Sequence, residues 1–76
     1  MTQQFVAHIV TQDTVKHIEE AFGVQVPQRA IEEAWWAIEG PNGFQSMLPH
    51  VAFQVTYTCI RQAGPETFIA ERLSPI

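Results

Sequence analysis

Residues 19–41, EEAFGVQVPQRAIEEAWWAIEGP, carry the strongest structural signals of the chain. Gly23 is placed to end one helix in the left-handed conformation, and Pro27 suits the first turn of the next. Gly40-Pro41 would stop that second helix. Its apolar residues share one side at helical spacing: Ile31, Ala34, Trp35 and Ile38. The stretch therefore predicts two consecutive helices joined by the short extended step Val24–Val26.

Upstream of this stretch, residues 4–10 read as a strand. Phe5, Ala7 and Ile9 alternate with Val6, His8 and Val10, and the run is rich in β-branched and aromatic residues. The alternative is that these residues are the first turns of a longer helix. Thr11 and Asp13 are candidate N-caps for the first helix, which is expected from Thr14 to Phe22.

Downstream, residues 50–61 are ambiguous between strand and helix. Apolar and polar residues alternate along them, which favours a long strand, although Pro49 and Gly64 would also frame a helix. Residues 65–73 are expected to form a short C-terminal helix, with Pro75 preventing its extension.

These elements predict an α+β fold in a single domain over residues 1–76. The order is strand, helix, helix, strand, helix, with a two-stranded sheet that carries the helices on one face. The alternative is an all-α four-helix arrangement.

Composition narrows the classes of function. The 76 residues include eight acidic and four basic ones, for a net charge of −4. This balance argues against direct nucleic-acid binding and against docking on anionic lipid, and it suits a partner with a basic surface. No apolar run is long enough for a membrane span, and the first residues lack a signal-peptide pattern. With the single Cys59, we expect a cytoplasmic protein in a reducing compartment.

No catalytic or metal-binding constellation is expected. A strand over residues 50–61 would place Cys59 and His50 roughly 30 Å apart and on opposite faces, so Cys59 is expected to be an apolar core residue. The three histidines show no zinc-ligand spacing, and the four glycines form no phosphate-binding loop. The sequence therefore predicts a protein that is not an enzyme and needs no cofactor.

The candidate partner-binding residues lie in the predicted helices. Glu32, Trp36 and Glu39 would share one outward row of the second helix, at spacings of four and seven. A tryptophan flanked by carboxylates suits a binding hot spot against a basic partner. The alternative is that Trp36 packs beneath the C-terminal helix.

Residues 19–27 and the following Ile31-Glu32-Glu33 resemble a segment of small type I-F anti-CRISPR proteins, over about one fifth of the chain. In that family too, a helix ends in Glu-Glu-Ala-aromatic-Gly, passes through Val-x-Val-Pro and enters a helix with paired glutamates. Acyl carrier proteins share the joint, but their prosthetic-group serine is absent here. The resemblance implies an acidic, non-enzymatic protein that binds the Cas surveillance complex, with the following glutamates imitating phosphate charges: Glu19, Glu20, Glu32 and Glu33.

The predicted function is accordingly a small, phage-encoded inhibitor of a bacterial nucleic-acid-handling defence complex. It would act through an acidic and aromatic helix face in the host cytoplasm. A structural or regulatory subunit of a homo-oligomer or larger complex is the competing class, favoured by high hydrophobicity and low charge. A small metal-dependent enzyme is the third.

Overall fold

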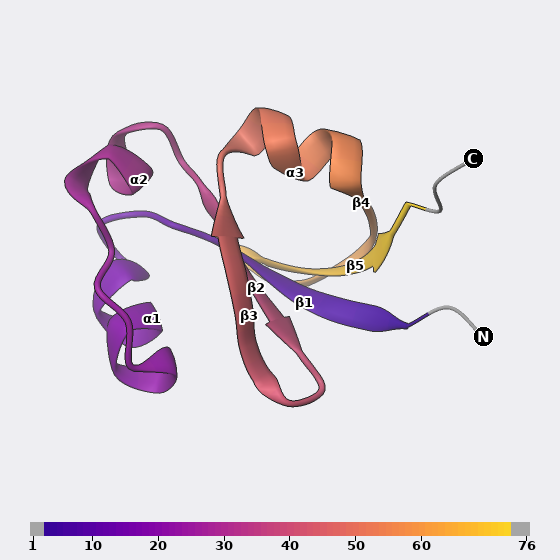
Figure 1. Ribbon diagram of the computed structural model, residues 1–76, viewed down its shortest axis with the longest axis horizontal. Helices are drawn as coiled ribbons and strands as arrows, with labels where there is room; N and C mark the ends of the chain where they lie inside the picture. Colours follow the sequence, from indigo (N-terminus) through magenta and orange to yellow (C-terminus); the bar gives the residue numbers. More distant parts are fainter. Residues whose placement is uncertain (1–2, 74–76) are drawn as a thin grey trace.

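The computed structural model describes residues 3–73, and its main feature is a five-stranded antiparallel sheet (Figure 1). The strand order is β3-β2-β1-β5-β4. The strands are β1 (Gln4–Ile9), β2 (Trp36–Gly40), β3 (Gly43–Leu48), β4 (Tyr57–Gly64) and β5 (Thr67–Arg72). The helices are α1 (Val15–Phe22), α2 (Gln28–Glu32) and α3 (His50–Thr56). Because β1 pairs with both β2 and β5, it lies in the middle of the sheet.

The sheet buries side chains on both faces. In Figure 1, α1 and α2 lie together at one end of the sheet, and α3 lies apart from them. One core joins α3 to the sheet and contains Phe5, Ala7, Trp36, Ile38, Phe53, Tyr57 and Ala70. The other joins α1 and α2 to it and contains Val10, Ile18, Ala30 and Ala37. Successive strand residues point to opposite faces, so neighbours such as Trp36 and Ala37 serve different cores.

Stacked aromatic rings form the centre of the α3 core. The rings of Trp36 and Phe53 are nearly parallel, with centroids 4.1 Å apart, and the Tyr57 ring stacks on Phe53 at 5.6 Å. Phe5 meets Tyr57 edge-on at 5.4 Å. Such pairs contribute about 0.5–1.5 kcal/mol each beyond the area that they bury. This stack therefore fixes α3 on β2 and β1.

The first strand and the first helix lie where the sequence predicts them. β1 occupies Gln4–Ile9 and α1 occupies Val15–Phe22. Gly23 ends α1 at a φ of 67°, and its amide donates to the carbonyl oxygen of Glu19 at 2.9 Å. The left-handed helix end expected at Gly23 is confirmed.

The fold is α+β, but the predicted arrangement of its elements is wrong. The described residues form a five-stranded antiparallel sheet with three helices, which replaces both the two-stranded sheet and the four-helix alternative. Three segments assigned incorrectly or incompletely account for the difference. They are residues 33–40, residues 43–48 and residues 57–72.

The second helix is much shorter than predicted. α2 ends at Glu32, and Ala34 then adopts a left-handed φ of 54°, which no helix interior accommodates. The next residues enter β2, where Trp36 and Ile38 face one core and Ala37 the other. The run Trp-Ala-Ile fits a strand buried on both faces as well as a helical stripe, and pairing with β1 decides between them.

The C-terminal part contains more strand than predicted. α3 occupies His50–Thr56, and the chain then becomes extended at Tyr57, where β4 begins. Residues 50–61 thus contain both a helix and the first half of a strand. Residues 67–72 form β5 instead of a helix, because they pair with β1 on one side and β4 on the other. No helix among residues 3–73 has the length and apolar character required to cross a membrane.

The left-handed residue after α2 gives a stability prediction. Ala34→Gly should raise the free energy of unfolding by about 1 kcal/mol, because glycine adopts positive φ without the steric cost that alanine carries. Urea denaturation measures the change.

The control is the opposite substitution, from glycine to alanine, at Gly23. An added Cβ there would meet no atom within 4 Å. Gly23→Ala should lower the free energy of unfolding by about 1 kcal/mol through backbone strain alone. A destabilised Ala34→Gly variant would contradict the assigned turn between α2 and β2.

Candidate functional site

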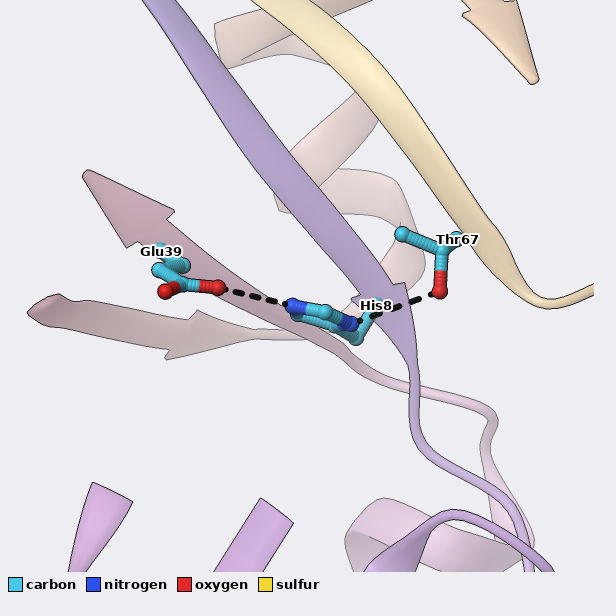
Figure 2. Close-up of polar contacts among 3 residues, drawn as sticks. All are labelled: His8, Glu39 and Thr67. Carbon is cyan, nitrogen blue, oxygen red and sulfur yellow. Dashed lines mark hydrogen bonds and ion pairs between the residues drawn. The ribbon is translucent and has the colours of Figure 1, made fainter. Parts of the chain in front are cut away.

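A polar cluster crosses the three central strands of the sheet. In Figure 2, His8 of β1 lies between Glu39 of β2 and Thr67 of β5. His8 Nε2 is 3.2 Å from Glu39 Oε1, and His8 Nδ1 is 3.5 Å from Thr67 Oγ1. The Phe22 ring of α1 lies beside the imidazole, with ring centroids 5.9 Å apart. The cluster therefore belongs to the sheet face that α1 and α2 partly cover.

The cluster contains the three groups of a nucleophile, a base and an orienting carboxylate. Because an ionised carboxylate only accepts hydrogen bonds, His8 Nε2–H donates to Glu39, and Nδ1 is left to accept from the Thr67 hydroxyl. An activated nucleophile lies about 2.6–3.2 Å from its base, shorter than the 3.5 Å found here. The geometry favours a cross-strand link over nucleophile activation.

This link should contribute measurably to stability. Glu39→Ala should lower the free energy of unfolding by about 1 kcal/mol, because it leaves a half-buried imidazole without its acceptor. Thermal denaturation at neutral pH measures the loss. Glu71→Ala on β5, the strand on the other side of β1, is the control and should change stability by less than about 0.5 kcal/mol. Equal losses in both variants would show that the link is energetically silent.

Charge is distributed unevenly along the chain. Residues 1–49 contain six acidic and two basic residues, whereas residues 50–76 contain two of each. The net charge of −4 therefore lies entirely in the part that includes α1 and α2. Within it, Asp13, Glu20 and Glu32 are exposed, and among residues 3–73 no hydrogen bond or ion pair engages their carboxylates. We call these three residues the acidic surface.

Two of the predicted phosphate mimics have internal partners instead. The Val26 amide donates to Glu19 Oε2 at 2.9 Å, which ties the extended step before α2 back to α1. Glu33 accepts from Arg29 Nε at 2.8 Å and from Trp35 Nε1 at 3.1 Å. Glu19 and Glu33 therefore shape the joint between the helices, whereas Glu20 and Glu32 remain available to a partner.

The contacts of Glu33 alter its protonation. The hydrogen bond from the Trp35 indole, followed by that from Arg29, lowers the pKa of Glu33 below its ordinary value. The hydrogen bond to Glu33 and the negative charge of Glu33 in turn raise the pKa of Arg29. A carboxyl group with a lowered folded-state pKa stabilises the fold above its unfolded-state pKa. That contribution is lost as the pH falls through the lowered value.

Removing the indole donor should bring the pKa of Glu33 back towards its ordinary value. Trp35→Phe should raise the pKa of Glu33 towards the ordinary glutamate value, as followed by carboxyl ¹³C NMR. Arg29→Gln is the comparison and should also raise it, because it removes both the hydrogen bond and the Coulombic attraction of Arg29. An unchanged Glu33 titration in Trp35→Phe would rule out the indole contact.

The predicted row of Glu32, Trp36 and Glu39 does not exist. Glu32 ends α2, whereas Trp36 and Glu39 belong to β2, on opposite faces of the sheet. Only 6% of Trp36 is exposed, and Glu39 bonds His8. The continuous apolar run Trp36-Ala37-Ile38 suits a strand buried on both faces, and this is the local signal for β2 in the sequence.

Cys59 also lies elsewhere than expected. It is exposed on β4 instead of forming part of the core, because β4 lies at the edge of the sheet. Partial burial of the thiol raises its pKa, so the thiolate is scarcer than in a free cysteine. Among residues 3–73, no group of three or more His, Cys, Asp or Glu residues is arranged to hold a metal ion.

No protein-family model matches the chain, and neither a curated protein nor a solved structure does.

Proposed function

We propose that this protein binds a basic surface of a partner protein through the acidic surface formed by Asp13, Glu20 and Glu32. The observation that carries the proposal is the confinement of all the net charge to residues 1–49. Complementary charge accelerates encounter and selects the partner, and it acts best from carboxylates that have no internal counter-ion.

The joint between α1 and α2 supports this role. Gly23 turns the chain out of α1, and Glu19 holds the Val26 amide at 2.9 Å. Pro27 is the N-cap residue of α2. These local contacts fix the path between the two short helices, so Glu20 and Glu32 are held on a defined scaffold. Less conformational entropy is then lost on binding.

The specific form of the proposal is inhibition of a bacterial nucleic-acid-handling complex in the cytoplasm. A protein that normally holds DNA offers a basic surface, and fixed carboxylates compete with phosphates for it. The resemblance of residues 19–33 to type I-F anti-CRISPR proteins favours a Cas surveillance complex as the target and a phage-encoded origin. In this form Glu20 and Glu32 imitate phosphates, whereas Glu19 and Glu33 shape the joint.

Charge reversal tests the proposal. Glu32→Lys should weaken binding to an assembled type I-F Cas complex about tenfold, because an attractive contact becomes repulsive. Binding of the wild type should also weaken as salt increases. Surface plasmon resonance with the immobilised complex measures both effects.

Glu71→Lys is the matched control, since it changes the net charge equally but lies on β5 in the neutral part of the chain. It should retain wild-type affinity. Equal weakening by both variants would show that affinity depends on net charge alone and not on the position of the charge. Absence of wild-type binding would refute the Cas complex as target.

A structural subunit is the second candidate function, and a different surface favours it. Among residues 3–73, the large hydrophobic residues that remain exposed lie in the neutral part: Val51, Val55, Ile60 and Leu73. Val51 and Val55 are 72% and 71% exposed on α3. Among residues 3–73, β4 pairs only with β5, so one edge of the sheet is open. A molar mass that rises with concentration in light scattering would favour this function, and a constant monomer mass would exclude self-assembly.

A further inference from the structure

A histidine at the start of α3 accepts a hydrogen bond from a buried tryptophan. Trp36 Nε1 of β2 donates to His50 Nδ1 at 3.0 Å, and the two rings are inclined by only 20°. His50 follows Pro49, the N-cap residue, and is the first residue of α3. The bond therefore joins the first turn of α3 directly to the sheet.

This bond exists in one protonation state only. An indole N–H donates and never accepts, so His50 Nδ1 must carry a lone pair, and its proton must lie on Nε2. Protonation of His50 places a second N–H where the lone pair was, and the two donors then face each other. The hydrogen bond is lost, and the Trp36 N–H remains without an acceptor in a largely buried position.

Among residues 3–73, no carboxylate forms an ion pair with His50. α3 contains no charged residue besides His50 itself when protonated, and β3 contains none. The one charged residue of β2, Glu39, lies on the opposite face of the sheet and contacts His8. Tyr57, the first titratable residue after α3 in the sequence, stacks on Phe53. The first turn of α3 therefore offers a protonated His50 no counter-ion.

His8 provides an internal contrast. Protonated His8 donates from Nε2 to Glu39 and from Nδ1 to the Thr67 hydroxyl, which accepts as readily as it donates. Protonation therefore keeps both contacts of His8, whereas it abolishes the contact of His50. The two histidines differ because His8 faces groups that accept, whereas His50 faces a donor.

We propose that the Trp36–His50 hydrogen bond is a pH-sensitive latch that releases the first turn of α3 from the sheet when His50 is protonated. Phe53 is 3% exposed and stacks on the Trp36 ring with centroids 4.1 Å apart, so it keeps the middle of α3 in place. Release is thus local: it opens the edge of the indole to water and leaves the sheet intact. The latch is independent of the function proposed for the acidic surface.

Nuclear magnetic resonance tests the latch on the whole protein. At neutral pH the imidazole ¹⁵N shifts of His50 should report the Nε2–H tautomer. As His50 protonates, the Trp36 indole N–H signal should shift in step with it and exchange with water about fivefold faster or more, because one hydrogen bond is lost. The Trp35 indole, which donates to Glu33, is the internal reference and should not follow His50.

His50→Gln is the decisive variant, since its side-chain oxygen accepts from the indole but does not titrate. The variant should keep the neutral-pH position of the Trp36 signal and lose its dependence on acid. A wild-type Nδ1–H tautomer, or a Trp36 signal unchanged while His50 protonates, would overturn the proposal. So would an identical acid response in folded His50→Gln. If this variant fails to fold, the wild-type titration alone decides.

Discussion

The pairing of β1 on both sides is the constraint on which the rest of the structure depends. β1 supplies Phe5 and Ala7 to the α3 core, and Val10 directly after it belongs to the core beneath α1 and α2. Backbone hydrogen bonds to β2 and β5 draw in segments about 30 and 60 residues away in the sequence. These long-range pairings override the local helical tendencies of the segments that they capture.

This constraint explains which parts of the fold could be predicted. Gly23 and the strand before α1 depend on local chemistry, and local chemistry is visible in the sequence. The strand at Trp36–Gly40 depends on β1, and its short apolar run suits either a helix or a strand buried on both faces. Residues 67–72 became a strand for the same reason, since they fill the place between β1 and β4. A single sequence does not reveal such partners.

For the candidate site too, features set by local chemistry could be predicted, whereas features set by long-range contacts could not. The net acidity of the chain was evident from composition, and Glu20 and Glu32 are exposed. The capping contacts of Glu19 and Glu33, the burial of Trp36 and the polar row through His8 all required three-dimensional placement. The chain thus divides into residues 1–49, which carry the net negative charge and include α1 and α2, and a neutral part with exposed apolar residues. The proposed function rests on this separation.

The most direct measurement is ¹⁵N NMR of the labelled protein titrated with an arginine-rich peptide at low and high salt. We expect shift changes concentrated on Asp13 to Glu33 and largely removed by salt, because the contact is electrostatic and exposed. Changes centred on α3 and β4, or changes that persist at high salt, would contradict it. The neutral apolar part would then be the binding surface.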